Sequence, residues 1–333
     1  MNRFFLNCIR LVPWASFCPV EMEGLNHTAV THFVFLGLTS NRELELTLFV
    51  IFCAMYLNIL AGNLLILVTV AHDRSLHTPM YFFLGNLSFI DICHSSVTAP
   101  KMLLDSLFLQ KTISFGGCMA QVFFLHLSAC AEIFLLTIMA YDRYVAICYP
   151  LHYKSLMNLK VCSWLVGSLW VGATIHSLVQ TVLTIHLPYC GPNIIDSFFC
   201  DVLPVIKLAC TDTYFTGVLI VSNSGTISLV CFLALVASYI VILVSLRGRS
   251  AEGCRKALST CVSHLMVVLL FLGPCIFLYT RPSSSFSMDK MVAIFYTAVT
   301  PMLNPVIYTL RNEEMKSSMK KLRGRTKVFS FKK

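Results

Sequence analysis

Residues 213–246 read TYFTGVLIVSNSGTISLVCFLALVASYIVILVSL, a run of 34 residues that contains no Lys, Arg, Asp or Glu. A helix needs about 20 residues to cross the roughly 30 Å of hydrocarbon in a bilayer, so this run is long enough to span a membrane. Four further charge-free runs lie at 46–72, 161–195, 257–280 and 291–310, and two more, at 74–104 and 112–141, contain only a few charges. The sequence therefore predicts seven membrane spans.

The composition of the whole chain supports the same fold class. Of the 333 residues, 57% are hydrophobic and only 12% are charged, whereas a soluble domain of this size would expose far more charged side chains. Transmembrane strands would appear as short alternating segments, so long continuous apolar runs favour helices. We therefore expect an all-α membrane protein with a seven-helix bundle over 46–310, whose spans lie at approximately 46–72, 80–104, 115–141, 161–186, 213–246, 257–280 and 291–310.

The basic residues predict the orientation of the bundle. Most of them fall in the loops after the first, third and fifth spans and in the tail 311–333, which places these segments in the cytoplasm. The N-terminal segment 1–45 is then extracellular, and its sequon at Asn26 would be glycosylated. A signal peptide is conceivable, but Arg10 and two prolines interrupt residues 1–21. We interpret these residues as a poorly ordered extension, with Met22 as an alternative start.

Four of the fifteen cysteines lie on the side predicted to be outside. Cys118 begins the third span, and Cys190, Cys200 and Cys210 share the loop between the fourth and fifth spans. Four cysteines in an oxidising compartment indicate two disulfides, and the sequence alone leaves three pairings open. No Cys or Cys/His cluster in the sequence has the spacing of metal ligands.

Asp142 and Arg143 stand side by side at the cytoplasmic end of the third span. In the simpler interpretation, Arg143 reaches water from the end of the helix or pairs with Asp142. In the sharper one, the pair is a latch that holds one arrangement of the helices and releases it in another. Arginine suits a latch because its planar guanidinium can exchange a carboxylate for backbone carbonyls.

Motifs spread along the chain carry a family resemblance. MAYDRYVAICYPLHY (139–153) resembles the signature of olfactory receptors, a branch of the rhodopsin-like G-protein-coupled receptors. Further matches are LHTPMYFFLGNLSFIDICHSSVTAPK (76–101), YCGPNIIDSFFCDVLPVIKLACTDT (189–213), KALSTCVSHLMVV (256–268) and PMLNPVIYTLRN (301–312). The resemblance covers roughly residues 22–322. A short third outer loop, at about 280–290, is similar to that of the tetrapod-type class II subgroup.

The resemblance implies a plasma-membrane receptor for small, mostly hydrophobic volatile odorants. Such a receptor activates a heterotrimeric G protein of the stimulatory olfactory type and raises cyclic AMP; it is not an enzyme and requires no cofactor. The implied disulfides pair Cys118 with Cys200 and Cys190 with Cys210. The implied ligand pocket lies in the outer half of the bundle, lined by His126, Ala129, Cys130, Val202, Asn223, Ile227, Ile276, Tyr279, Ile294 and Thr297. Leu272 departs from the pattern, because the family usually has an aromatic residue there.

Two acidic residues lie within the predicted spans, Asp91 in the second and Glu132 in the third. Carboxylates at mid-membrane are rare and usually functional. If the bundle follows the family's fold, these two can face each other, and they then share a proton or bind a cation. We hypothesise a sodium site with Asn63 and Asn304 nearby, and a structural pair that shares a proton is the alternative.

Pro305 interrupts the hydrogen bonding of the seventh span within the run Asn304-Pro305-Val306-Ile307-Tyr308. A proline kink can be purely structural, but the resemblance makes this segment an activation switch, in which Tyr239 meets Tyr308 after the sixth span moves. The predicted switch and G-protein-coupling residues are Asp142, Arg143, Tyr144, Tyr239, Asn304, Pro305 and Tyr308. Beyond the span, Met315, Met319 and Leu322 recur among lysines, which predicts an amphipathic helix on the lipids of the inner leaflet.

Other functional classes fit less well. A transporter usually shows repeated halves, and no internal repeat is visible. A retinal protein needs a lysine in the last span, and 291–310 contains none. Scattered pairs such as His72-Asp73 lack the spacing of zinc or hydrolase sites. A non-sensory receptor of the same fold is the main alternative. The net charge of +9 follows from topology and lipid headgroups, so we expect no nucleic-acid partner.

Overall fold

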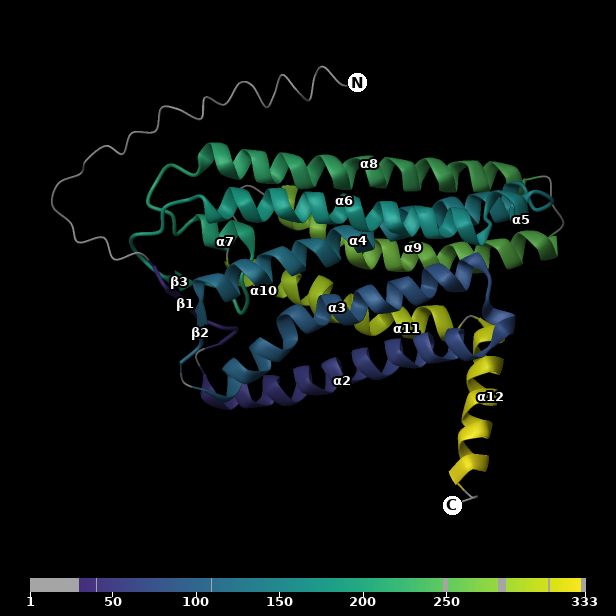
Figure 1. The fold of residues 1–333 in the computed structure, drawn as a ribbon, viewed down its shortest axis with the longest axis horizontal. Helices are drawn as coiled ribbons and strands as arrows, with labels where there is room; N and C mark the ends of the chain where they lie inside the picture. The colour runs from purple at the N-terminus through teal and green to yellow at the C-terminus, as the bar shows by residue number, and fades with distance from the viewer. Residues whose placement is uncertain are drawn as a thin grey trace.

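The computed structural model describes residues 30–39, 41–108, 110–247, 251–280, 286–310 and 312–330. The extension 1–21 and the sequon at Asn26 lie outside these residues, and so does the side chain of Tyr279. Within the described residues, seven helical rods run side by side (Figure 1). The all-α bundle predicted from the sequence is therefore confirmed.

Six of the rods are single helices, and the seventh is interrupted. The single helices are α2 (Arg42–His72), α3 (Pro79–Leu107), α4 (Phe115–Cys148), α6 (Leu159–Ile185), α8 (Tyr214–Leu246) and α9 (Ala251–Thr280). The seventh rod consists of α10 (Phe286–Ile294), the π-helical turn η2 (Phe295–Val299) and α11 (Thr300–Leu310). Short helices lie in the connections: η1 (Arg74–Leu76), α5 (Tyr153–Leu156) and α7 (Val202–Ile206).

By length and composition alone, five helical segments among the described residues could cross a membrane. These are Arg42–His72, Phe115–Cys148, Leu159–Ile185, Tyr214–Leu246 and Asp289–Thr309, and Cys261–Ile276 is a shorter apolar stretch. Helix α3 is more polar because it carries residues such as Asp91 and His94. Both of these side chains are fully buried, so the polar face of α3 points into the bundle.

Polar side chains define where several helices begin. The Asn41 side chain accepts hydrogen bonds from the backbone of Glu43 and Leu44 at the start of α2. Asn158 and Ser114 cap α6 and α4 in the same way. Such caps satisfy backbone N–H groups that have no partner within the helix. The loop sequences therefore set the ends of these helices.

The seventh rod is tied closely to its neighbours at its irregular turn. The Thr300 hydroxyl donates to the backbone oxygens of Phe295 and, in α9, Leu270, at 3.1 Å each. At Gly62 in α2, an added β-carbon would lie 3.1 Å from the β-carbon of Pro305. A larger residue at Gly62 would therefore force α2 and α11 apart.

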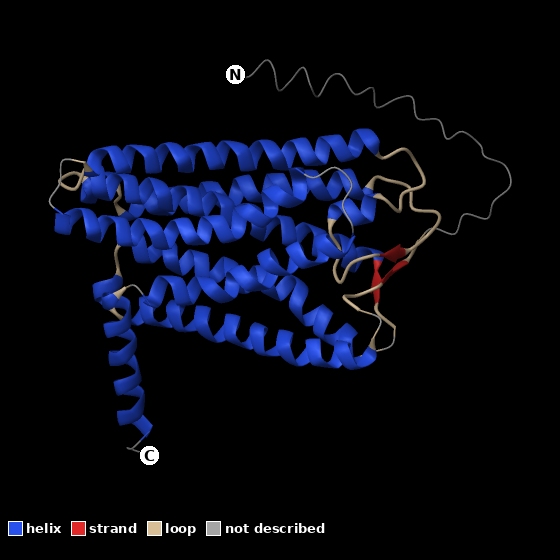
Figure 2. Ribbon diagram, turned by 180° about the vertical axis from the view of Figure 1, so that it is seen from behind, coloured by secondary structure: helices blue, strands red, loops and turns tan. Residues whose placement is uncertain are grey.

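A small sheet, which was not predicted from the sequence, covers one end of the bundle (Figure 2). Its strands are β1 (His32–Phe35), β2 (Thr112–Ser114) and β3 (Ile194–Ile195), in the order β2-β1-β3. Strand β1 pairs antiparallel with β2 and parallel with β3. Phe33 in β1 is fully buried and its ring lies 5.9 Å from that of Phe115. We call this the lid end of the bundle.

The opposite end carries α12 (Glu313–Ser330), which leaves the bundle sideways, and we call it the α12 end (Figure 1). Met315 is fully buried against the bundle, and Met319 packs on the same core. The Tyr81 hydroxyl donates to Asn312 and Glu314 at 3.0 and 2.9 Å. Met315 and Met319, which were predicted for the apolar face of an amphipathic helix on lipid, thus pack against the bundle itself.

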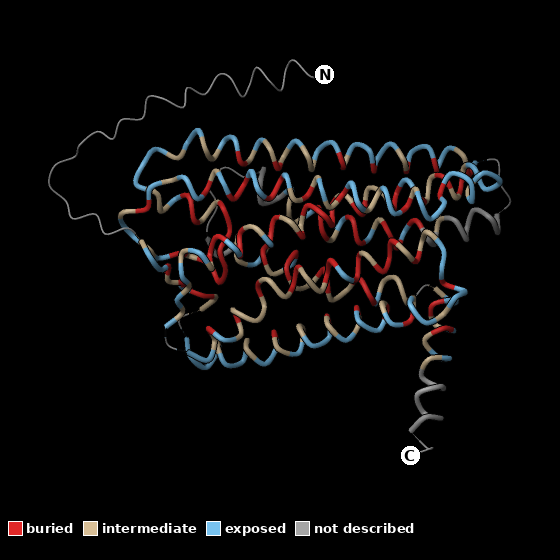
Figure 3. The backbone as a smooth tube through the Cα atoms, viewed as in Figure 1, coloured by how far each residue is buried: buried red, intermediate tan, exposed pale blue. Residues whose placement is uncertain are grey.

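Helix α4 lies at the centre of the bundle, where the buried residues concentrate (Figure 3). It contacts α3, α6, α8 and α9. Large apolar side chains on the outer helix faces are exposed, for example Trp164, Leu229 and Leu269. Such an apolar exterior is suited to a lipid environment, because exposing apolar surface to lipid avoids the free-energy cost of exposing it to water.

Candidate functional site

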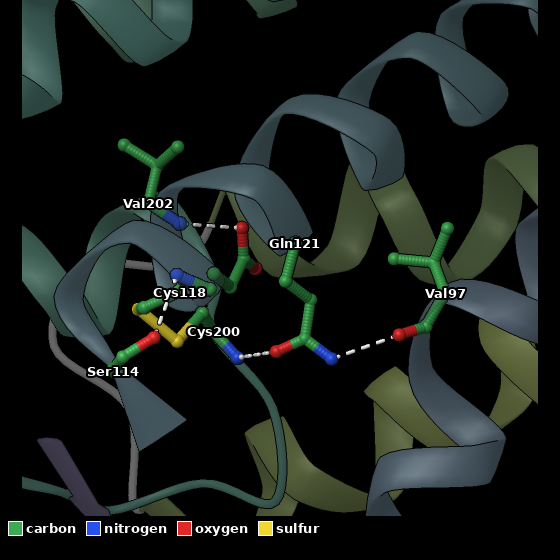
Figure 4. Close-up of a disulfide and its surroundings, with 8 residues drawn as sticks. Val97, Ser114, Cys118, Gln121, Cys200 and Val202 are labelled. Carbon is green, nitrogen blue, oxygen red and sulfur yellow. Dashed lines mark hydrogen bonds between the residues drawn. A yellow bond between two sulfur atoms is a disulfide. The ribbon is translucent and has the colours of Figure 1, made fainter.

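Two disulfides fasten the long loop 187–213, which we call the lid, at the lid end. Cys118 at the start of α4 is bonded to Cys200 in the lid (Figure 4), and Cys190 is bonded to Cys210 within the lid. The Cα–Cα distances of 5.4 and 5.9 Å are ordinary for disulfides. These are the two pairs that the family resemblance implies.

Gln121 adds a polar tie at the same place. Its side-chain oxygen accepts from the backbone N–H of Cys200 at 2.8 Å, and its nitrogen donates to the Val97 carbonyl of α3 at 2.9 Å (Figure 4). Because Gln121 is buried, these bonds are shielded from water. The lid is therefore held to both α3 and α4, and its position above the bundle is fixed.

A cavity lies beneath the lid, between α4, α6, α8, α9 and the seventh rod. Four of the residues predicted to bind ligand line it, namely His126, Ala129, Cys130 and Ile227. The remaining lining residues are Leu125, Ile133, His176, Asp201, Ser224, Ser228, Cys275 and Tyr296. Most of the wall is apolar, and the polar groups gather where His126, His176 and Asp201 meet.

Several other predicted pocket residues lie elsewhere. Val202 is buried in the apolar cluster around the Cys118–Cys200 disulfide, and Asn223 lies next to His176 without lining the cavity. Ile294 and Thr297 line a separate small cavity between α2, α3 and the seventh rod. Ile276 is 38% exposed and does not line the cavity under the lid. Of the predicted set, four residues therefore line the cavity under the lid, two line the other cavity and three line neither, because the rotation of each rod decides which way a side chain faces.

Several polar residues of the cavity were not predicted from the sequence, among them His176 and Asp201. His176 lies in the charge-free run 161–195 together with Ser177 and Gln180, and Asp201 follows the disulfide-bonded Cys200. Polar residues within an apolar span were a usable signal, since such residues usually face the bundle interior. The signal at Asp201 was weaker, because a loop carboxylate is ordinarily solvated.

The two acids predicted for the bundle interior are both fully buried. Asn304 donates from its side-chain nitrogen to both oxygens of Asp91, at 3.0 Å each. Asn63 uses its side-chain nitrogen on the backbone oxygens of Ile59 and Pro301. Within the described residues, Asp91 and Glu132 are close enough to interact electrostatically. The structure thus brings together Asp91, Glu132 and Asn304, while Asn63 is bonded to Pro301 in the same helix as Asn304.

The free atoms of this cluster are oxygens. Both carboxylate oxygens of Glu132 and the side-chain oxygens of Asn63 and Asn304 are buried without a hydrogen-bond partner among the described residues. Hard cations such as sodium are held by carboxylate and carbonyl oxygens, so this donor set fits one. In the described parts of the chain, no group of three or more His, Cys, Asp or Glu side chains is arranged so that it could hold a metal ion.

The predicted latch has a different partner at the α12 end. The Tyr153 hydroxyl, in the loop after α4, donates to Asp142 at 2.8 Å, and no ion pair joins Asp142 to Arg143 among the described side chains. Neighbouring residues on a helix do not face each other, which explains the difference. Burial and the negative charge of Asp142 raise the pKa of Tyr153 well above its usual value, so Tyr153 stays the donor.

Arg143 instead lies close enough to buried groups of the other rods to act on them electrostatically. Its charge acts on Tyr239, Tyr308 and His264. The Tyr239 hydroxyl lies 2.5 Å from His264 Nδ1, while the buried Tyr308 hydroxyl has no hydrogen-bond partner within the described part of the chain. Tyr239 and Tyr308 are therefore not bonded to each other in this arrangement. Tyr144, also predicted here, points toward Tyr149 at 3.5 Å.

Comparison with known proteins covers almost the whole chain. The profile of the olfactory receptor family matches residues 52–325. Olfactory receptor 4E2 of Mus musculus is 72% identical over 304 residues, which cover 91% of this chain and 99% of that protein. Olfactory receptor 4E2 of Homo sapiens is 69% identical over 309 residues, covering 93% and 99%. Olfactory receptor 4E1 of Homo sapiens is 62% identical over 302 residues, covering 90% and 96%.

Proposed function

The chain belongs to the olfactory receptor family, and on that premise we propose which ligands, partners and residues serve it. Members of this family are G-protein-coupled receptors and not enzymes, so the protein is a membrane receptor for odorants. The proposal has three parts: a volatile ligand binds in the cavity under the lid, a stimulatory G protein binds at the α12 end, and a sodium ion binds between them.

The cavity under the lid carries the first part. Its wall is mostly apolar, and the lid above it is held by the Cys118–Cys200 disulfide and by Gln121. Small-molecule sites are typically concave and apolar with a few polar groups that orient the ligand. A volatile odorant would gain about 25 cal/mol for each Å² of apolar surface buried there. His126, Ala129, Cys130 and Ile227 are the proposed ligand contacts.

The α12 end carries the second part. We expect the segments 144–154, 246–258 and 311–314 to form a cleft near Arg143, in which the C-terminal helix of a Gα subunit would dock as a helix in a groove. A ligand that binds better to the arrangement with α9 tilted outward would shift the population toward it. We accordingly propose that the protein lies in the plasma membrane with the lid outside and α12 in the cytoplasm, which is the orientation that the basic residues favour.

An odorant panel tests this proposal. Cells that express residues 22–333 with an N-terminal tag should bind anti-tag antibody without permeabilisation, and some volatile, hydrophobic panel members should raise cyclic AMP. Cells lacking the olfactory-type stimulatory Gα subunit should lose the response and regain it when the subunit is restored. A tag reachable only after permeabilisation, or a full panel without any response from surface-exposed receptor, would contradict the proposal.

The sodium ion is proposed because four buried oxygens have no hydrogen-bond partner among the residues that the structure describes. Glu132 and Asp91 would supply the negative charge, and the side-chain oxygens of Asn63 and Asn304 would complete the shell. Such an ion would be coupled to the arrangement of the rods, because Asn304 and Asn63 belong to different ones. The alternative, in which the two carboxyl groups share a proton, needs no ion.

Replacing sodium by potassium at constant ionic strength should change the odorant concentration for half-maximal response by about fivefold or more. The measurement is cyclic AMP formation in isolated membranes. Glu132→Gln removes one charge at almost constant volume and should abolish this sodium dependence. Glu43→Gln, at an exposed position in the first turn of α2, is the matched control and should keep it. If wild type ignores sodium and Glu132→Gln behaves as wild type, the site binds no sodium.

A further inference from the structure

The polar end of the cavity contains a gap between two groups that face each other. The Asp201 carboxylate oxygen Oδ1 and the His126 ring nitrogen Nε2 are 4.0 Å apart, and both side chains are largely buried. A direct hydrogen bond between a nitrogen and an oxygen spans about 2.7–3.2 Å, so these two atoms are not bonded to each other. The groups therefore approach one another across the cavity wall without satisfying each other.

The other ring nitrogen of His126 identifies which proton the imidazole carries. His126 Nδ1 lies 3.0 Å from the backbone oxygen of Val122, one turn earlier in α4. A carbonyl oxygen only accepts, so Nδ1 must be the N–H that donates this bond. In the neutral imidazole Nε2 then has a lone pair and no proton. The gap to Asp201 thus separates two hydrogen-bond acceptors, which explains why it stays open.

Asp201 is held in place by its role at a helix start. Its Oδ1 accepts from the backbone N–H of Val202 at 2.7 Å and caps α7. Cys200 beside it is fixed by the disulfide and by Gln121. The carboxylate therefore cannot turn away into solvent when the cavity fills. A carboxylate oxygen has more than one lone-pair site, so Oδ1 can accept a second hydrogen bond from a molecule in the cavity while it caps α7.

A third group lies within reach of the same gap. The ring of His176 lies 6.1 Å from that of His126, and its Nδ1 is buried without a partner among the described residues. A ligand hydroxyl suits this arrangement, because it donates one hydrogen bond and can also accept or share another. Ketones, ethers and esters offer only acceptors, and these would face a carboxylate and a bare ring nitrogen.

We propose that the cavity selects its ligands by a hydroxyl head group, which donates into the gap between Asp201 and His126 while an apolar body fills the rest of the cavity. The ligand class is thus an aliphatic, terpenoid or phenolic alcohol. This inference rests on the proposed function, because it names the ligand of the same cavity. It assigns to Asp201 a role in ligand specificity in addition to its capping of α7.

Matched compounds test the preference for a donor. The panel consists of alcohols and phenols, each paired with its methyl ether, its carbonyl analogue where one exists, and the primary amine of the same skeleton. Among the skeletons that activate wild type, the alcohol should need a concentration about ten- to hundred-fold lower than its ether or carbonyl partner. Equal potency of alcohols and ethers would overturn the hydroxyl assignment, and so would potency of the amines above that of the alcohols.

Asp201→Asn sharpens the test because the amide oxygen can still cap α7 while the amide nitrogen presents N–H groups to the gap. The advantage of alcohols over ethers should shrink at least tenfold or reverse. Asp212→Asn is the matched control, since Asp212 accepts from the Tyr214 backbone at 2.9 Å and is exposed, away from the cavity. It should keep the wild-type preference. An Asp201→Asn receptor with an unchanged preference would overturn the proposal.

Failure of this inference is distinguishable from failure of the proposed function. If ethers and carbonyl compounds raise cyclic AMP as well as alcohols do, the receptor function stands and only the hydroxyl assignment fails. If surface-exposed wild type responds to no compound of any class, the proposed function itself fails. His126→Phe provides a second measurement, because it removes Nε2 at similar ring size and should reduce the alcohol preference where Asp201→Asn impairs expression.

Discussion

Cys118→Ala is expected to remove the receptor from the cell surface. The Cys118–Cys200 disulfide closes a segment of 82 residues, and the chain-entropy model assigns such a crosslink about 4–5 kcal/mol of the free energy of unfolding. The bond also positions the lid. Its backbone N–H at Cys200 donates a hydrogen bond to the Gln121 side chain, which requires the lid to be in place. The measurement is antibody binding to an N-terminal tag on intact cells, normalised to total receptor, which should fall to background.

The controls distinguish the effect of losing this disulfide from the effect of losing any one cysteine thiol. Cys53→Ala removes a free cysteine within α2 and should leave surface expression unchanged. The double change of Cys118 and Cys200 should be no worse than either single change, because both remove the same bond. Cys190→Ala opens a segment of only 20 residues and should have a smaller effect. A Cys118→Ala receptor that reaches the surface and answers its odorant would refute the pairing.

Arg143→Ala should reach the surface yet produce no odorant-dependent rise in cyclic AMP. Arg143 is only partly buried at the end of α4 and forms no ion pair among the described residues, so folding does not depend on a salt bridge there. Its charge lies among Tyr239, Tyr308 and His264, which belong to three different rods. Removing the guanidinium should therefore disconnect the rods that must rearrange to admit the G protein.

Matched changes make this second prediction specific. Arg74→Ala removes an exposed arginine from the loop at the same end and should keep at least half of the response. Arg143→Lys keeps the charge but loses the planar fork, so it should restore little of the signal. Surface expression is measured in the same cells. An Arg143→Ala receptor with an intact cyclic AMP response would remove Arg143 from the mechanism.

Sequence reasoning succeeded where a residue's neighbours along the chain decide its environment. The apolar runs predicted the rods, and the resemblance implied the disulfide pairs that the structure forms. It was less successful where the partner comes from elsewhere in the fold. Asp142 bonds Tyr153 and not Arg143, since a helix turns adjacent side chains to different faces. Ile294 and Thr297 line a different cavity from His126, because the rotation of the seventh rod turns them toward α2 and α3.

The sheet at the lid end shows a further limit. Its strands contain only two to four residues each and come from three separate segments of the chain. Strands this short carry almost no periodic signal. They pair because the lid and the loop before α4 are already held together by the Cys118–Cys200 disulfide, so Phe33 finds a buried position next to Phe115.

The sequence by itself determined that this protein is a helical membrane receptor of the olfactory family, because the length of its apolar runs and its motifs are properties of consecutive residues. Only the tertiary structure decided which polar groups face one another: Asp201 with His126, Asn304 with Asp91, and Tyr153 with Asp142. Each of these pairs joins residues whose meeting depends on how the rods and loops are placed around α4, and no local pattern encodes that placement.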